Sequence, residues 1–422
     1  MTTMQNLLEG VIERRALERS ADWLAVAVAV SLPWSTTATS ILVVLWLLSV
    51  LPTLEIAAVR RELTSAAGGL PVLLWVLAAL GLFWAHSDVS WSERLSGFAA
   101  FHRLLAIPVL LAQFRRSEHG SRVLLGFFAS VTAVLILSWS IVLFPSLPWH
   151  PPEFGVPAKD YILQSENFLI CAFILLAIAL EHLTLLRWRS AVGLAVVAIA
   201  FLANIAFVAS GRTTFLVAPV LTLLLGWRQW HWRGLISGAI FFCVLGAAAA
   251  VVSPYLRTRI ETSLTELHAW RKTDAVNSTA LHLQFLKEAI SFVRTAPIIG
   301  HGTGSIIEQY RKEAVGETGA AAVASSNPHD QILAVGIQLG LVGIAVLLAM
   351  WVAHLALFRG GGLICWIGLV IVTENVVSSL VNSHLFDFTQ AWIYIFGVGA
   401  AGGTVLRQTK PARRHETDSI AA

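Results

Sequence analysis

Charged residues are scarce in this chain. Only 13% of the 422 residues are Asp, Glu, Lys or Arg, whereas 56% are hydrophobic and the mean hydropathy is +0.73. A soluble globule has too little interior to hide that much apolar surface, so this composition excludes a soluble domain. Alternating strands of about ten residues, typical of membrane barrels, are also absent. The sequence therefore predicts an all-α integral membrane protein.

Cysteine is equally rare. The three cysteines, Cys171, Cys243 and Cys365, all fall inside apolar stretches, so no disulfide framework is expected. The chain also lacks internal repeats, low-complexity tracts and a small-residue cleavage site after its first apolar block. We therefore expect that block to remain as a membrane span and not to be removed as a signal peptide.

Apolar runs recur along the chain, and a spanning helix needs roughly 20 such residues. They predict twelve transmembrane helices, near residues 17–33, 36–52, 71–86, 99–114, 121–144, 163–181, 190–209, 213–227, 234–253, 329–357, 362–380 and 385–406. The first two are short and are split by Pro33-Trp34. Merging them would place Arg60 and Arg61 outside, so we keep them separate.

The positive charges test this topology, because Lys and Arg in short loops stay on the cytoplasmic side. With the N-terminus inside, seventeen of them fall on the cytoplasmic face; the opposite face, apart from the long polar segment after the ninth span, receives only Arg94, Arg103, Lys159 and Arg212. The polar segment after the ninth span is then external. The predicted domains are residues 1–253 (nine spans), 254–328 (external loop), 329–406 (three spans) and 407–422 (cytoplasmic tail).

The external loop contains two amphipathic patterns. In residues 257–270, apolar residues at helical spacing predict a helix that lies on the membrane surface: Ile260, Leu264 and Leu267. A second helix is predicted at residues 282–296 and ends at Pro297. Its expected buried face consists of Leu283, Leu286, Ile290 and Val293.

A glycine-rich loop, Gly300-His301-Gly302-Thr303-Gly304, follows the second helix and precedes a helical run from Ser305. Glycines before a helix can let backbone N–H groups approach a phosphate, aided by the positive end of the helix. A plain turn explains the same spacing equally well. Farther on, Gly336, Gly340 and Gly343 stand at small-residue spacing, which predicts close helix packing.

Two polar positions carry the strongest functional signal. Arg212 stands in a short external turn, where a surface position would tolerate any polar residue, so its charge indicates anion binding. In Asn327-Pro328-His329-Asp330, Pro328 suits a first helical turn and places His329 near a helix N-terminus. The helix dipole disfavours the imidazolium there and keeps the ring available as a base. An ordinary hydrogen-bonded histidine is the alternative.

Other polar groups are open to two interpretations. Arg103, beside His102, either reaches the membrane interface or holds an anion in an external cavity. Asp387 either orients a neighbouring His or Arg or makes structural hydrogen bonds. Glu374, within the eleventh span, is expected to be a buried hydrogen-bonding group and not a catalyst.

Together these stretches resemble the O-antigen ligase superfamily of bacterial inner-membrane glycosyltransferases. The resemblance rests on Ser210-Gly211-Arg212-Thr213, on residues 297–304, on Asn327-Pro328-His329-Asp330-Gln331-Ile332-Leu333 with Gly340-Leu341-Val342-Gly343, and on residues 381–387. It covers roughly residues 205–345 and 378–390. The N-terminal half matches only in its pattern of spans.

The sequence departs from the family in two places. The family usually has an arginine just before the amphipathic helix that leads into the glycine loop, and His282 stands there in this chain. Either His282 substitutes for it, or Arg271, Lys272 or Arg294 supplies the second cation. Asp330 also replaces a usual asparagine, which is a milder change.

The resemblance implies a fold like that of membrane glycosyltransferases of the GT-C type, in the bacterial inner membrane with both termini cytoplasmic and the active site periplasmic. It implies transfer of a glycan from undecaprenyl diphosphate to lipid A–core in the outer leaflet. His329 would be the base, Arg212 would hold the diphosphate, and in-line attack would invert the anomeric carbon. Further substrate-binding residues are expected to be Arg103, Arg271, His282, Arg294, His301, Gly302, Gly304, Asn327, Asp330 and Asp387.

The expected partners are the lipid-linked donor, the lipid acceptor and the surrounding membrane lipid, with no nucleic acid. The external segment has no Asp-x-Asp pair or carboxylate cluster but several arginines, so we expect a metal-independent enzyme without a cofactor. An O-antigen polymerase or a protein O-oligosaccharyltransferase would share the motifs. A lipid flippase or transporter is the non-enzyme alternative, although transporters tend to place polar groups near the bilayer midplane.

Overall fold

The computed structural model describes residues 2–149, 151, 153–273 and 276–409, with side chains from residue 13 onward except at positions 263 and 270–273. Within these ranges the chain is helical, and a single bridge between Glu153 and Val156 is the only β-type pairing. Eight of the described helices are long and apolar enough to cross a membrane. The expectation of an all-α membrane protein is thus supported.

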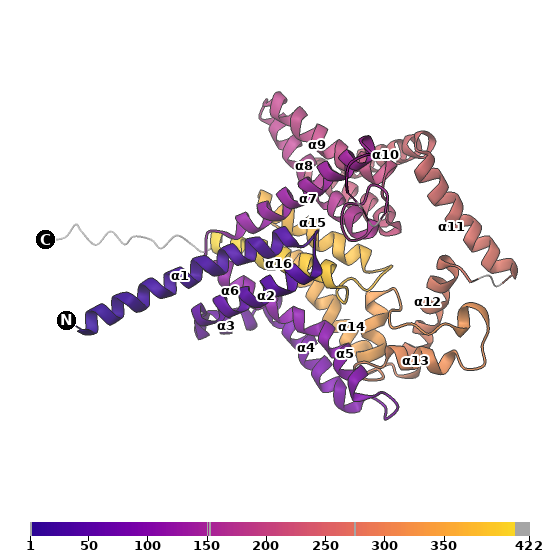
Figure 1. Cartoon of the computed structure of the whole chain (residues 1–422), viewed down its shortest axis with the longest axis horizontal. Coiled ribbons are helices and arrows are strands. Elements are labelled where there is room, and N and C mark those ends of the chain that lie inside the picture. The colour runs from indigo at the N-terminus through magenta and orange to yellow at the C-terminus, as the bar shows by residue number, and fades with distance from the viewer. Residues whose placement is uncertain (1, 150, 152, 274–275, 410–422) are drawn as a thin grey trace.

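Helices follow one another with short connections (Figure 1). Their bounds are α1 (Thr2–Ser31), α2 (Thr36–Val50), α3 (Ile56–Leu63), α4 (Ala66–Trp84), α5 (Trp91–His102), α6 (Ala106–Arg116), α7 (Gly120–Leu143), α8 (Tyr161–Thr184), α9 (Trp188–Phe207), α10 (Arg212–Val252), α11 (Pro254–Thr273), α12 (Ser278–Thr295), α13 (Ile306–Glu313), α14 (Gln331–Leu357), α15 (Leu363–Ser378) and α16 (Phe388–Gln408). Three short 3₁₀ turns, Leu51–Thr53, Arg103–Leu105 and Gly319–Ala322, complete the described elements.

Helix α10 consists of two helical segments, called arms below, that meet at a kink. Trp230 (φ −138°, ψ 17°) and His231 (φ 49°, ψ −129°) interrupt it. The arms pack so closely that a Cβ atom on Gly234 would lie 1.8 Å from the Gly226 carbonyl oxygen. These arms correspond to the predicted spans 213–227 and 234–253. Helical structure covers most of every one of the twelve predicted intervals, while the number that actually crosses the membrane remains a prediction.

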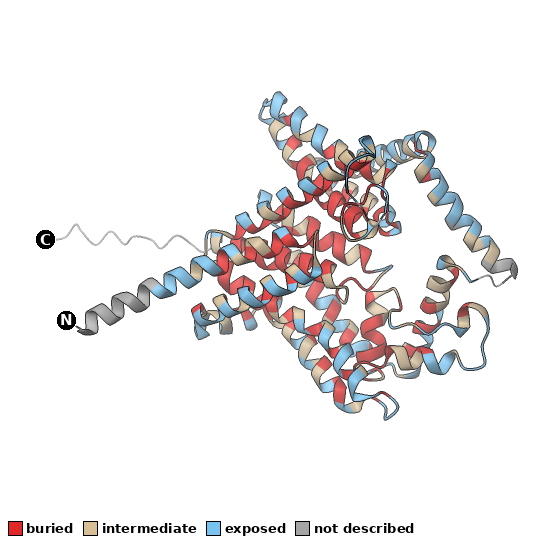
Figure 2. Cartoon of the chain, viewed as in Figure 1, coloured by how far each residue is buried: buried red, intermediate tan, exposed pale blue. Residues whose placement is uncertain are grey.

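The core lies where α16 packs against α6, α7 and α15, and where α8 packs against α9 (Figure 2). Large aromatic side chains fill it, and some of its polar groups are paired. The indole of Trp366 donates to the Phe173 carbonyl at 3.1 Å, and His354 lies between the Tyr394 hydroxyl and the Ala67 carbonyl. Helices α11 to α13 lie at the opposite end of the molecule from α1 and α3 (Figure 1).

Helix α12 buries a different face from the predicted one. Leu283 and Leu286 are only partly buried and Ile290 is exposed, whereas the fully buried residues are Ala280, Phe285, Glu288, Ala289 and Phe292. The prediction was wrong because two aromatic side chains determine the packing. Phe285 and Phe292 both meet the ring of Tyr310 edge-on, with centroids 5.3 and 5.0 Å away. The aliphatic stripe is left at the surface.

Helix α14 is broken at Gly340, whose φ of +61° is not helical. The break separates the Leu341 and Val342 N–H groups from the carbonyls that they would meet four residues earlier. Segment 297–302 replaces both bonds. Leu341 and Val342 donate to the carbonyls of Pro297 and Ile298 at 2.7 and 3.2 Å, and His301 and Gly302 donate to those of Ile337 and Gln338 at 2.8 and 3.0 Å.

The glycine loop is therefore a packing element. Besides the bonds of His301 and Gly302, the N–H of Thr303 donates to the Gly81 carbonyl at 3.0 Å and that of Gly304 to Oε1 of Gln338 at 2.8 Å. The loop packs between α14 on one side and α4 and α5 on the other. Each of these four N–H groups donates a hydrogen bond to a protein acceptor. The arrangement favours the plain-turn interpretation over a phosphate cradle.

We predict that Gly302→Ala destabilises the protein more than Gly316→Ala. Both glycines have left-handed φ values, +92° and +82°, but a Cβ on Gly302 would lie 2.4 Å from the Ala85 Cα, whereas nothing lies within 4 Å at Gly316. Overpacking at Gly302 should cost about 1–3 kcal/mol beyond the shared conformational cost. Thermal unfolding in detergent would measure the difference in stability. Equal melting temperatures for the two variants would contradict the close packing of the glycine loop.

Candidate active site

The turn before α14 holds His329 in an unusual conformation. His329 has φ +56°, in the left-handed region, and its N–H donates to Oδ1 of Asn327 at 2.8 Å. Asp330 caps the helix, because its Oδ1 accepts from the Leu333 N–H at 2.8 Å. The helix thus begins at Gln331, and the expectation that Pro328 stands in the first turn was wrong. His329 still lies next to the helix N-terminus, as predicted.

The loop between α15 and α16 secures this turn. Nδ2 of Asn327 donates to Oδ1 of Asn382 at 3.1 Å. Gln331 is tied to the same loop, because its N–H donates to the Ser379 carbonyl at 2.9 Å and its Oε1 accepts from the Leu385 N–H at 3.0 Å. Side chains from two chain segments therefore fix the position of His329.

Helix α12 supplies the wall against which His329 packs. The rings of His282 and His329 lie 3.9 Å apart between centroids, at an interplanar angle of 32°. Phe285 lies nearly parallel to His329 at 6.0 Å, and it is held in turn by Tyr310, whose hydroxyl donates to the Phe285 carbonyl at 2.7 Å. The structure thus brings His282 and His329 into direct contact.

Both imidazoles are neutral near pH 7. Burial lowers the pKa of His329 below its ordinary value of 6.5, although Asn382 and Asp387 act in the opposite direction. Burial, His329 and Arg212 together lower the pKa of His282 to about 4. Among the described residues, no hydrogen-bond partner reaches the buried Nδ1 atom of His329. A neutral imidazole is suited to accept a proton.

Arg212 is the first residue of α10 and faces α11 and α12. Its Nη2 atom lies 3.0 Å from Oε2 of Glu266, and its Nη1 atom donates to the Ser278 hydroxyl at 3.3 Å. The Thr279 hydroxyl donates to the same Glu266 oxygen at 2.5 Å. The Thr279 hydrogen bond and Arg212 lower the pKa of Glu266, so it is a carboxylate at neutral pH. A half-exposed guanidinium therefore stands beside the histidine pair.

Two further predicted residues meet on the α15–α16 loop. Arg103 donates to the carbonyls of Phe386 and Asp387 at 3.1 and 2.8 Å, and its guanidinium lies 5.3 Å from the Phe388 ring centroid. Asp387 occupies the N-cap position of α16, and its carboxylate lies 3.2 Å from Nδ1 of His384. Arg103 thus braces the loop that secures His329.

Other predicted residues lie apart from this site. Arg294 is exposed in the last turn of α12, twelve residues after His282 and thus about 18 Å farther along the helix axis. His301 forms hydrogen bonds with Thr295 and with the Phe292 carbonyl. Gly302 and Gly304 belong to the glycine loop that packs against α14. The side chain of Arg271 lies outside the part of the chain that the structure describes.

Sequence analysis missed Glu166 and Asn382. Glu166 is buried in α8, where its Oε1 atom accepts from the Thr213 hydroxyl at 2.8 Å, one residue after Arg212. A carboxylate inside an apolar span was the available signal, because such groups are rare and usually functional. Asn382 lies in the stretch 381–387 that carries part of the resemblance, but only Asp387 was singled out there.

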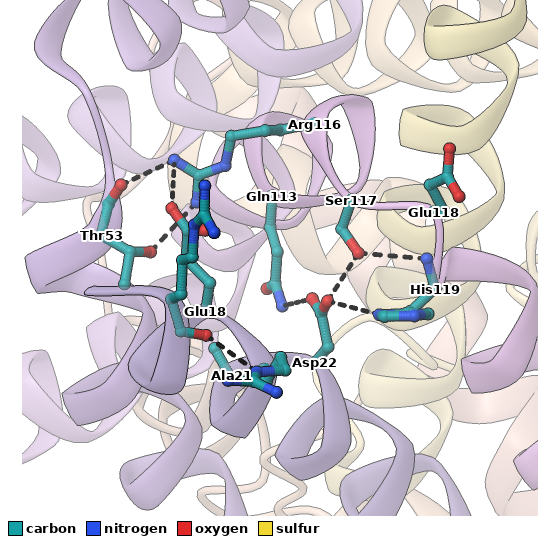
Figure 3. A pocket seen from close by; sticks show the side chains of 11 residues that line it. Glu18, Ala21, Asp22, Thr53, Gln113, Arg116, Ser117, Glu118 and His119 are labelled. Carbon is teal, nitrogen blue, oxygen red and sulfur yellow. Dashed lines mark hydrogen bonds and ion pairs between the residues drawn. The ribbon is translucent and has the colours of Figure 1, made fainter. Parts of the chain in front are cut away.

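A pocket of about 420 Å³ lies elsewhere, at the junction of α1 with the α6–α7 turn (Figure 3). At its floor, Asp22 accepts hydrogen bonds from Gln113 and Ser117 at 2.8 and 2.6 Å and lies 2.9 Å from His119. The residues predicted to form the active site do not line it, so this pocket is separate from the histidine pair.

Comparison with known families supports the resemblance found in the sequence. Residues 195–348, which run from α9 into α14, match the family model described as O-antigen ligase. The matched segment contains Arg212, His282 and His329. No curated protein matches the chain.

We predict that acidification destabilises the folded protein partly through His282. Its pKa is about 4 when folded and about 6.5 when unfolded, so below pH 6.5 the unfolded chain binds the extra proton. Stability should therefore fall as the pH drops from 6.5 toward 4. Melting temperatures measured across this range should fall less steeply for His282→Asn than for the wild type. Parallel curves would contradict the burial of a neutral His282.

Proposed function

We propose that this chain, which carries an O-antigen ligase family domain in residues 195–348, is a glycosyltransferase that moves O-antigen polysaccharide from undecaprenyl diphosphate to lipid A–core. The reaction is assigned to the periplasmic face of the bacterial inner membrane, with both termini cytoplasmic. The observation that carries the proposal is the neutral His329 in contact with His282, a ring whose pKa Arg212 lowers.

His329 takes the proton from the attacking sugar hydroxyl. A general base must be neutral at working pH, and the burial of His329, which lowers its pKa, supports this condition. As the acceptor oxygen bonds to the anomeric carbon, the bond to the diphosphate oxygen breaks. Attack from the side opposite the leaving group inverts the configuration at that carbon.

Arg212 neutralises the charge that develops on the leaving diphosphate. A guanidinium can bind two phosphate oxygens at once, and the N-terminus of α10 adds a positive dipole at the same place. The positive charge at this site comes from an arginine, so the proposed reaction is independent of a metal ion and of a cofactor. The histidine at position 282 is neutral and so contributes ring contact and not charge.

Purified protein should transfer glycan from an undecaprenyl-diphosphate-linked O-polysaccharide to lipid A–core in the presence of EDTA, and His329→Ala should lower the rate about 10²–10⁴-fold. Gel mobility of the glycan measures transfer. The matched control is His86→Ala, since His86 is an exposed histidine that pairs with Asp88 in the α4–α5 loop and should leave the rate unchanged.

The position of the glycan separates the alternatives. Glycan that grows on its own carrier, with lipid A–core unmodified, would indicate a polymerase. Transfer that requires added Mg²⁺ would contradict the role of Arg212 as the charge-neutralising group. Absence of transfer under both conditions would favour a transporter, and a folded His329→Ala variant with wild-type rate would exclude His329 as the base.

The pH dependence of transfer gives an independent test. Protonated His329 cannot accept a proton, so the rate should fall on the acid side with a midpoint below 6.5, because burial lowers the pKa of His329. Initial rates measured from about pH 5 to pH 8 would show this limb. A midpoint well above 6.5 would mean that another group titrates.

A further inference from the structure

A buried histidine lies beneath the proposed site between two carboxylates. His384 is fully buried in the α15–α16 loop, with Nε2 3.2 Å from Oε1 of Glu166 and Nδ1 3.2 Å from Oδ2 of Asp387. Burial disfavours its charged form, but Glu166 and Asp387 outweigh that cost and raise the pKa of His384 well above its ordinary value. Glu374 of α15, which is buried like Glu166, is a third carboxylate that acts on it.

One end of this network reaches the turn that carries Arg212. Oε1 of Glu166 accepts from the Thr213 hydroxyl at 2.8 Å, and the hydroxyl of the preceding residue, Ser165, accepts from the Gly211 N–H at 3.0 Å. Two consecutive side chains of α8 therefore hold the residues on either side of Arg212. The backbone at Arg212 cannot shift without breaking one of these bonds.

The other end reaches the turn that carries His329. Oδ1 of Asn382 accepts from the Ser383 N–H at 2.9 Å and from Nδ2 of Asn327 at 3.1 Å, and Asn327 in turn holds the N–H of His329 at 2.8 Å. His384 stands next to Ser383, so its ion pairs fix the loop from which Asn382 projects. The Glu166–Thr213 hydrogen bond, the two ion pairs of His384, the backbone from His384 to Asn382, and the Asn382–Asn327 hydrogen bond thus connect the turn at Arg212 to the turn at His329.

We propose that Glu166 and His384 are positioning residues that set the placement of Arg212 relative to His329. The two groups that they connect belong to α10 and to the turn before α14, and among the described residues no hydrogen bond or ion pair joins Arg212 to His329 directly. The inference rests on the proposed function, because it says that the network positions the donor-binding Arg212 and the base His329 relative to each other. Neither residue touches the reacting atoms.

Removing the charge of Glu166 should therefore impair chemistry more than binding. Glu166→Gln keeps an oxygen that can accept from Thr213 but loses the ion pair with His384. We expect kcat to fall about 10- to 100-fold with little change in KM, because misplacement by about 1 Å can cost that much. Thr213→Val, which removes only the hydroxyl, should give a smaller fall in kcat at wild-type stability.

A double-mutant cycle distinguishes positioning from general damage. If Glu166 and Asn327 act along one path, the effects of Glu166→Gln and Asn327→Ala on kcat should be strongly non-additive. The control pair is Glu166→Gln with Ser130→Ala, since Ser130 accepts from the Trp34 indole in another part of the molecule, and its effects should add. Wild-type kcat in both Glu166→Gln and Thr213→Val, or additive effects with Asn327→Ala, would overturn the proposal.

Hydrogen exchange tests the same proposal without any activity. In Glu166→Gln, amide exchange should accelerate at residues 208–214 and 325–330, while residues 86–90, which lie off the path, should keep their wild-type rates. If the wild type transferred no glycan, the proposed function would fail, but this measurement would still decide whether Glu166 links the two turns. Unchanged exchange in both segments would show that it does not.

Discussion

The break in α14 at Gly340 is the constraint on which the site depends. Within lipid, each unpaired backbone group costs several kcal/mol, so a broken helix persists only where other groups replace its lost bonds. Segment 297–302 replaces both bonds that the break removes. Because that segment directly follows α12, α12 is tied to α14. His282 on α12 consequently faces His329 at the start of the same broken helix.

The site separates neutral and charged groups by depth. His282 and His329 lie against each other near the surface, where partial burial without a carboxylate partner keeps both rings neutral. His384 lies deeper, yet two carboxylates keep it charged. Burial alone would give the opposite order, so the placement of carboxylates decides the charge of each histidine. The neutral histidines therefore lie near the surface, where His329 is the proposed base, and the ion pairs of His384 lie deeper.

The sequence allowed much of this architecture to be predicted, because apolar runs of membrane length determine where helices form. The position of His329 beside a helix N-terminus was also predicted from Asn327-Pro328, although the helix begins after the capping Asp330 and not at Pro328. The buried face of α12 was not, since aliphatic and aromatic residues both recur there at helical spacing and only the partner, Tyr310, decides between them. Likewise, the glycines in residues 300–304 are compatible with close approach of either a phosphate or another backbone segment. The break at Gly340 leaves carbonyl groups without helical partners, and the loop binds these groups.

The partner of Arg212 explains how a single guanidinium could serve a dianionic leaving group. Glu266 now holds it at 3.0 Å, but Glu266 also accepts from the hydroxyl and the N–H of Thr279 at 2.5 and 3.3 Å. When a diphosphate takes Arg212, those two bonds keep Glu266 at the junction of α11 and α12. The diphosphate would then replace the Glu266 carboxylate as the anion bound to Arg212. No buried charge would be left without a partner, because Glu266 is only partly buried. In the proposed reaction, donor binding would therefore require a side-chain movement and not the unfolding of α11.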